Sequence, residues 1–318
     1  MLKPWLLLTF AVLPLPHVAH SQVTFSHGWG GTGSAPGAFS HPVGIALDQS
    51  GRVYVADWGN GRIQIFTTAG QYLGLLGPTL LNNRPWGIAI GPDANLYVTR
   101  EGHGVEVYTT SGSLVSAWGS SGTGNGQFAG PRGIAVDSQG RVFVADTGNN
   151  RVQAFTSAGV FLGKWGGLGS CLGCFNNPSG MAVSNGEFYV ADVLNHRIQV
   201  FNFPSGYVRQ WGVSGILPGQ LTSPTGLAFD TEGRIYVADQ SNSSISVFTT
   251  TGGFLHSWGS FGAFGSDPCC FNVPTAVAVD YSGYTYVADQ GNNYIKVYAP
   301  AATAAAPTSW GRVKATYR

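Results

Sequence analysis

The chain has 318 residues and a formal net charge of +1, and 43% of its residues are hydrophobic. Charged residues make up only 10% of the chain, while 47 glycines and 17 prolines accompany an aromatic content of 13%. This composition excludes an intrinsically disordered chain, which needs low hydrophobicity and high net charge, and it favours β-structure rich in turns.

The distribution of charge argues against a nucleic-acid partner. All 15 acidic residues lie within residues 22–298, whereas four of the 16 basic residues, Lys3, Arg312, Lys314 and Arg318, lie outside that range. The body of the chain therefore has 12 basic and 15 acidic residues, a balance of −3. Binding to a phosphate backbone requires clustered positive charge, so we expect no nucleic acid.

The first 21 residues have the features of a secretory signal peptide. Lys3 precedes an apolar run, and Ala19 and Ser21 are small residues at a suitable distance before a cleavage site at Gln22. The alternative is a membrane anchor, but the run is shorter than the roughly 20 residues that cross a bilayer and contains two prolines. We expect an exported chain, secreted or periplasmic/extracellular, with no transmembrane segment.

One sequence unit occurs six times between the leader and the C-terminus. The copies begin at prolines that follow one another at intervals of 43 to 50 residues, namely Pro42, Pro85, Pro131, Pro178, Pro224 and Pro274. The third copy predicts four antiparallel strands separated by turns, at 133–136, 142–145, 152–155 and 160–165. Such a sheet cannot bury both faces alone, so the copies must pack against one another.

Radial packing is favoured over an open solenoid, because the first and last copies are both regular rather than capping units. Small residues in each first strand suit the crowded centre of a ring, and Trp-Gly pairs in the outer strands suit the wider gaps between sheets. We predict an all-β, six-bladed β-propeller of four-stranded antiparallel blades over 22–298, and an Ala/Pro-rich linker with a basic tail over 299–318.

The ring needs a strand that completes its last blade. The segment 25–30, FSHGWG, resembles an outer strand placed before the first copy, so closure by the N-terminus is the prediction. The competing segment is 309–311, SWG, in the C-terminal tail.

The phrases PVGIALDQSGRVYVADWGNGRIQIF and PRGIAVDSQGRVFVADTGNNRVQAF resemble repeats of the NHL family. The resemblance covers residues 23–298 and implies a six-bladed β-propeller. It implies function less directly, because propellers of this family serve as protein-binding, RNA-binding and, in one branch, lyase domains.

Five copies contain an Asp that is followed three residues later by an Asn. The pairs are Asp57 and Asn60, Asp146 and Asn149, Asp192 and Asn195, Asp239 and Asn242, and Asp289 and Asn292. Repeated carboxylates could ligate metal, but Asp and Asn are also typical of tight turns, which is the interpretation we prefer. Arg62, Arg151 and Arg197 open the next strand of their copies and are candidates to pair with the Asp.

The family's lyase branch, peptidyl-hydroxyglycine lyase, holds zinc with histidines and an aspartate in the central channel. The histidines here do not supply that set: His27 and His256 fall in outer strands, and His196 falls in a turn. No nucleophile elbow or phosphate-binding loop occurs. We therefore expect no cofactor and keep a metal-dependent lyase or hydrolase only as the alternative.

The second copy departs from the repeat, and such departures often mark functional sites. It has Arg84 and Trp86 around its proline, and Arg100 and His103 where other copies have the Asp-to-Asn turn. With Arg132 and His41 from neighbouring copies, these residues form the candidate ligand-binding set Arg84, Trp86, Arg100, His103, Arg132 and His41. Arginines beside a tryptophan suit a peptide carboxylate or a sugar. Drift in a tolerant repeat is the other explanation.

Four cysteines fit an oxidising compartment. The shortest loops predict bridges Cys171–Cys174 and Cys269–Cys270, although four cysteines allow three connectivities and a four-thiolate zinc site is a further alternative. Taken together, the sequence predicts an exported, monomeric, non-catalytic scaffold that presents loops on one propeller face to a protein, peptide or glycan ligand.

Overall fold

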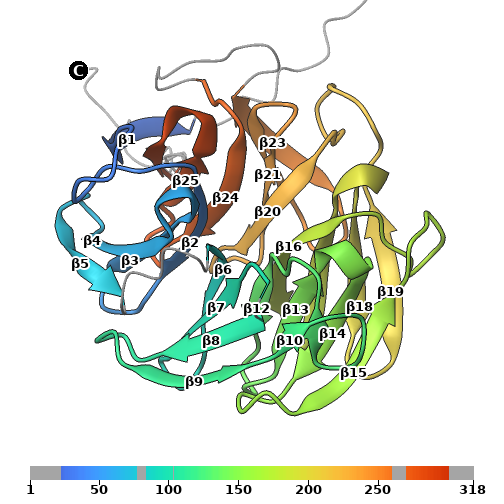
Figure 1. The fold of residues 1–318 in the computed structure, drawn as a ribbon. Coiled ribbons are helices and arrows are strands. Elements are labelled where there is room, and N and C mark those ends of the chain that lie inside the picture. Colours follow the sequence, from blue (N-terminus) through green and yellow to red (C-terminus); the bar gives the residue numbers. More distant parts are fainter. Residues whose placement is uncertain (1–22, 77–83, 103, 260–269, 301–318) are drawn as a thin grey trace, which may run out of the picture. The chain divides into compact units, whose positions relative to one another are not determined.

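The computed structural model describes residues 23–76, 84–102, 104–259 and 270–300, and the compact unit spans Val23–Pro300. The expected signal peptide, most of the linker and tail, His103 and Cys269 lie outside the described residues. Six four-stranded antiparallel sheets are arranged around an axis, so that the chain passes from blade to blade around a ring (Figure 1). The predicted all-β, six-bladed propeller is confirmed.

Each blade runs in chain order from its innermost to its outermost strand, except for blade 6. Blade 1 consists of β2 (Pro42–Leu47), β3 (Arg52–Asp57), β4 (Arg62–Thr67) and β5 (Tyr72–Leu76). Blade 2 consists of β6 (Pro85–Ile90), β7 (Leu96–Arg100), β8 (Gly104–Tyr108) and β9 (Leu114–Trp118). Blade 3 consists of β12 (Ile134–Val136), β13 (Val142–Asp146), β14 (Arg151–Phe155) and β15 (Phe161–Gly166). A short parallel pair, β10 (Ser120–Ser121) and β11 (Gln127–Phe128), lies in the link before blade 3.

Blade 4 consists of β16 (Pro178–Ser184), β17 (Glu187–Asp192), β18 (Arg197–Asn202) and β19 (Gly206–Trp211). Blade 5 consists of β20 (Pro224–Phe229), β21 (Ile235–Asp239), β22 (Ser244–Phe248) and β23 (Phe254–Gly259). Blade 6 consists of β24 (Pro274–Val279), β25 (Thr285–Asp289), β26 (Tyr294–Ala299) and β1 (Thr24–Gly30). Four blades have a single 3-10 turn between their second and third strands: η1 (Trp58–Asn60), η2 (Thr147–Asn149), η3 (Val193–Asn195) and η4 (Gln290–Asn292).

The second and third strands of each blade are almost fully buried because both of their faces pack against neighbouring blades. Six hydrophobic clusters form the core, and each joins side chains of two adjacent blades. The outer-strand tryptophans Trp29, Trp118, Trp165, Trp211 and Trp258 each pack against one of these clusters. This confirms that the large rings fill the gaps between blades.

The N-terminal strand closes the ring. β1 pairs with β26 from Thr24 opposite Ala299 to Gly30 opposite Tyr294, and Figure 1 shows blue β1 in the same sheet as the red strands of blade 6. Closure by the N-terminus is therefore confirmed. The outer-strand position of blade 6, for which the segment 309–311 was the competing candidate, is occupied by β1.

One end of the propeller gathers the features on which the candidate site depends. Each inner strand begins there and each second strand ends there, as the pairing of Pro42 with Asp57 illustrates. The links between blades and the turns between second and third strands lie at this end. We call it the entrance face.

Candidate functional site

A repeated polar network organises the entrance face. In blade 1, Asp57 Oδ1 accepts a hydrogen bond from Ser40 N–H at 2.7 Å, and Asp57 Oδ2 accepts from Asn60 Nδ2 and Arg62 Nε, each at 2.8 Å. Gln64 Nε2 donates to the same oxygen at 3.1 Å. The carboxylate is fully buried, so these donors replace the water that it loses on folding.

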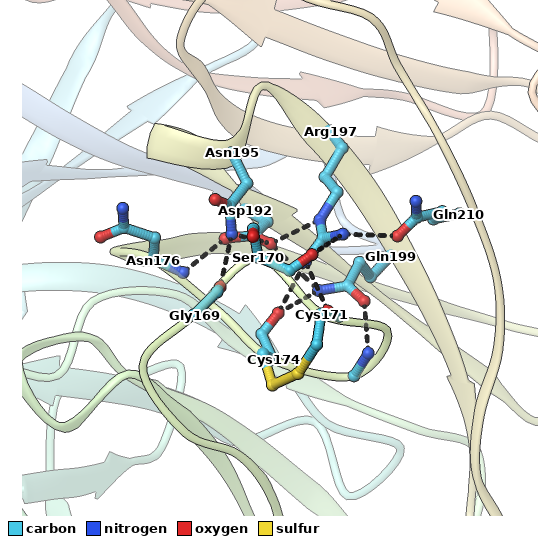
Figure 2. The surroundings of a disulfide bond; sticks show 11 residues. Gly169, Ser170, Cys171, Cys174, Asn176, Asp192, Asn195, Arg197, Gln199 and Gln210 are labelled. Carbon is cyan, nitrogen blue, oxygen red and sulfur yellow. Dashed lines mark hydrogen bonds and ion pairs between the residues drawn. A yellow bond between two sulfur atoms is a disulfide. The ribbon is translucent and has the colours of Figure 1, made fainter.

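Blades 3 and 4 repeat the network, and Figure 2 shows its form around Asp192. Arg197 also donates to the carbonyl oxygens of Ser170, Cys171 and Cys174 in the link that precedes the blade. The Asp and Asn residues therefore support the turn and the link. Because their donors are protein groups, these Asp and Asn residues have a structural role at the turn and the link in these blades.

Cys171 and Cys174 form a disulfide in that link, as predicted (Figure 2). The predicted Cys269–Cys270 bridge involves Cys269, which lies outside the described residues.

Arg100, which the sequence places in the candidate ligand-binding set, occupies the position of the buried Asp in blade 2 and is itself buried. Its side chain is 2% exposed and forms an ion pair with Glu106 at 2.6 Å. Arg100 Nη2 also donates to Tyr108 Oη at 3.1 Å. The guanidinium is enclosed within its own blade, so it is not available to a ligand on the entrance face. His103 lies outside the described residues.

The other four candidate residues gather in one cluster around two tryptophans. The Arg84 guanidinium carbon lies 4.1 Å from the ring centre of Trp58, and that of Arg132 lies 4.5 Å from the ring centre of Trp86. The two indoles meet edge to face at 6.1 Å. His41 contacts Trp58 in the same geometry at 6.1 Å. We call His41, Trp58, Arg84, Trp86 and Arg132 the entrance cluster.

Trp58 was missed by the sequence reasoning although a signal was present. The residue that follows the buried Asp or Arg varies among the copies, and only blade 1 has a tryptophan there: the six residues are Trp58, Glu101, Thr147, Val193, Gln240 and Gln290. The first residue of η1 thus projects an aromatic ring toward the inner-strand entrance of blade 2. Asn177 was also missed, and it accepts a hydrogen bond from Arg132 Nη1 at 3.2 Å.

Arg132 lines a cavity of about 220 Å³ together with Trp86, Glu101, Thr147 and Asn177. Its guanidinium is partly buried and, among the described residues, has no ion pair within 4 Å. Burial lowers the pKa of Arg132, and the negative charge of Glu101 opposes that shift. A guanidinium that is partly removed from water and has no ion-pair partner favours the binding of an anionic ligand.

The central channel offers little chemistry by comparison. Its cavity measures about 70 Å³ and is lined by the inner strands, with Thr225, Thr275 and Ser179 as its hydroxyl side chains. In the described part of the chain, no three His, Cys, Asp or Glu side chains lie close enough together to hold a metal ion. The described residues thus give no support for the lyase alternative. They also include no helix of the length and hydrophobicity that a membrane crossing requires.

Comparison with known proteins places the repeat in a family. The NHL repeat model matches residues 39–66, 128–155, 175–201 and 221–248, which correspond to blades 1, 3, 4 and 5. Human E3 ubiquitin-protein ligase TRIM32 is 32% identical over 140 residues, covering 39% of this chain and 20% of the relative. Human NHL repeat-containing protein 3 is 35% identical over 81 residues, covering 25% and 23%. The chain thus spans less than a quarter of either relative.

Solved structures with the same architecture are more distant in sequence. A Bacteroides thetaiotaomicron protein of unknown function superposes with a TM-score of 0.69 at 17% identity, covering 87% of this chain and 76% of that one. A streptogramin B lyase superposes with a TM-score of 0.62 at 12% identity, covering 88% and 98%. At these identities the similarity shows the propeller fold alone.

Proposed function

Because this chain belongs to the NHL-repeat family and folds as a six-bladed propeller, we propose that it is a non-catalytic binding scaffold. Its ligand is a polypeptide segment that presents a carboxylate to the entrance cluster. The observation that carries the proposal is the pairing of Arg132 with Trp86 beside a cavity of about 220 Å³. The guanidinium supplies charge and several N–H donors, and the indole holds it in a fixed plane.

The geometry favours a carboxylate over a glycan. A sugar ring binds by stacking on an open aromatic face, but one face of Trp58 and one face of Trp86 are covered by guanidinium groups. A carboxylate can reach Arg132 without displacing either stack. It can belong to an acidic side chain or to a chain terminus, since both present the same two oxygens.

The test is to select peptides that bind the full chain without residues 1–21. Two random libraries are used in parallel, one with amidated C-termini and one with free C-termini. We expect the selected peptides to share an acidic side chain or a free terminus. Arg132→Gln should weaken binding about tenfold or more, the usual effect of losing a charged hydrogen bond. Fluorescence anisotropy with labelled peptides measures the change.

Arg52→Gln is the matched control, because Arg52 is exposed and lies at the opposite end of blade 1. It removes the same charge and should leave binding unchanged. Selected peptides without a carboxylate, or equal binding by Arg132→Gln, would contradict the proposed ligand. Enrichment on a glycan array instead of the peptide library would point to the glycan ligand.

Export is the second part of the proposal. The leader features of residues 1–21 and the Cys171–Cys174 disulfide support an oxidising compartment. N-terminal sequencing of protein recovered outside the cytoplasm should begin at Gln22, and an intact Met1 on that protein would contradict a cleaved leader.

A further inference from the structure

Blade 5 contains a buried carboxylate whose usual cation is missing from the sequence. Asp239 is fully buried and accepts hydrogen bonds from Thr222 N–H, Ser223 N–H and Asn242 Nδ2, each at 2.8 Å. The positions of the network Arg and Gln are occupied by Ser244 and Ser246. Among the described residues, no Lys, Arg or His lies within ion-pair distance of Asp239.

The link that precedes blade 5 nevertheless keeps the backbone geometry of links that hold an arginine. Leu221 N–H donates to Val213 O at 2.9 Å, as Phe39 N–H does to Gly31 O at 2.8 Å in blade 1. Asn242 Nδ2 donates to Gly215 O at 2.9 Å, as the equivalent Asn does in blade 1 at 2.8 Å.

In blade 1, Arg62 donates to the carbonyl oxygens of three link residues at 2.7 to 2.9 Å, namely Ser34, Ala35 and Ala38. The residues at the same places in the link of blade 5 are Ile216, Leu217 and Gln220. Blade 5 therefore keeps the three backbone carbonyl positions that accept from the arginine in blade 1, but it lacks the arginine itself.

A cavity of about 180 Å³ lies at this position. Its lining includes the three link residues together with Asn242, Ser244 and Ser246. Asn242 Oδ1 is buried and has no hydrogen-bond partner, although an unpaired buried acceptor is costly. Burial raises the pKa of Asp239 above 3.8 even though its hydrogen-bond donors oppose the shift. The cavity lining thus supplies several acceptors, and the Asp239 carboxylate lies directly behind it, hydrogen-bonded to the lining residue Asn242. Among the described residues, no cation pairs with this carboxylate.

We propose that the blade-5 cavity binds the guanidinium group of an arginine side chain from a partner polypeptide. A guanidinium has five N–H donors in a planar fork, which suits one carboxylate and surrounding carbonyl oxygens better than the single charged group of lysine. Ile216 and Leu217 are 59% and 64% exposed at the link. They give the arginine stem and its neighbours an apolar contact.

Three small probes test the chemistry directly: N-acetyl-arginine amide, N-acetyl-lysine amide and N-acetyl-citrulline amide. Citrulline has nearly the shape of arginine and no charge. We expect the arginine probe to shift the side-chain amide resonances of Asn242 and the backbone amide of Ser244 in NMR titrations. It should bind at least about tenfold more tightly than the citrulline probe. Equal shifts with arginine and citrulline, or no shift with either, would overturn the proposal.

Ser244→Arg supplies a blocking variant that does not depend on disrupting the fold. The new side chain takes the place that Arg62 has in blade 1, so the arginine probe should no longer bind while the melting temperature rises. Thr251→Arg adds the same charge at the opposite end of blade 5 and should still bind the probe. Unimpaired probe binding by Ser244→Arg would exclude this cavity as the site.

The stability of Ser244→Arg should also depend on pH in a defined direction. Because the folded-state pKa of Asp239 is raised above 3.8, burial of its charge destabilises the fold above that pKa and has no such effect below 3.8. An ion pair removes this penalty. The gain in melting temperature should therefore be small at the most acidic pH and grow as the pH rises. The site is on other blades than the entrance cluster, so either proposal can fail alone.

Discussion

Gly180 lies in the inner strand of blade 4, where two blades approach so closely that no β-carbon fits. A Cβ built on Gly180 would lie 2.0 Å from Thr225 O of blade 5, and one on Gly133 would lie 2.0 Å from Ser179 O. The obstacle is backbone in both cases, so a side-chain rotation cannot relieve the contact. Small residues in the inner strands are thus required by the packing of the ring.

Gly180→Ala should lower stability by about 1–3 kcal/mol, the usual cost of overpacking a core. Alanine also restricts the unfolded chain, which would by itself stabilise the protein by about 0.4–1 kcal/mol, so the clash decides the sign. Gly163→Ala in β15 is the control, because its Cβ would meet its nearest neighbour at 3.6 Å. Urea unfolding should separate the two variants, and equal midpoints would contradict the packing argument.

The entrance cluster shows how far single residues could be interpreted from the sequence. Arg84 and Trp86 stood out because they break the repeat, and Arg132 was added from the equivalent entrance of the next copy. The structure does bring these three residues together. Arg100 broke the repeat as well, but its partner Glu106 lies on the next strand and buries it. A sequence gives the identity of an unusual residue, whereas its exposure depends on a cross-strand partner six positions away.

Strand pairs of blades 2 and 6 carry the same ion pair with opposite polarity. Arg100 and Glu106 pair at 2.6 Å in blade 2, and Asp289 and Lys296 pair at 3.0 Å in blade 6. The two sites have the same register, since Val98 faces Glu106 as Val287 faces Lys296. In these two blades the two positions hold opposite charges, and either position can be the acidic one.

Glu106→Gln should destabilise the protein by about 3 kcal/mol, because it leaves the buried Arg100 without its carboxylate. The double variant Arg100→Asp with Glu106→Lys copies blade 6 and should recover much of that loss. Glu232→Gln is the control, because its side chain is 65% exposed in its ion pair with Arg234 and such pairs contribute about 0–1 kcal/mol. Chemical denaturation measures all three, and no recovery in the double variant would contradict the interchangeable polarity.

At the scale of the whole molecule, the repeat made the fold predictable from the sequence. Proline spacing gave the number of blades, the Trp-Gly segment 25–30 gave the closing strand, and the strands of the third copy were placed to within a residue at each end. The interblade contacts at the entrance face were not predictable, because links of different composition have similar backbone paths. The blades differ at the entrance face in the side-chain contacts that join residues of two neighbouring copies.

Ring closure depends on contacts that β1 makes with both ends of the ring. Besides pairing with β26, this strand places Trp29 in the cluster between blades 6 and 1, and His27 Nε2 lies 2.9 Å from Thr68 O of blade 1. Asn293 Oδ1 accepts a hydrogen bond from His41 N–H at 2.7 Å across the same junction. Removal of β1 would expose one edge of β26 and part of two interblade clusters.

A chain without residues 1–30 should therefore lose more than about 3 kcal/mol, the scale of removing one buried tryptophan, while a chain that lacks only residues 1–21 should keep its stability. Because Thr24 faces Ala299, β1 can also be attached after β26 through a tight turn, as outer strands are in the other blades. A rearranged chain that begins at Gly31 and carries residues 24–30 after Ala299 and the turn 156–159 should recover the cooperative thermal transition followed by circular dichroism. If this rearranged chain stayed as unstable as the deletion, β1 would act through its sequence position and not through the pairing that completes blade 6.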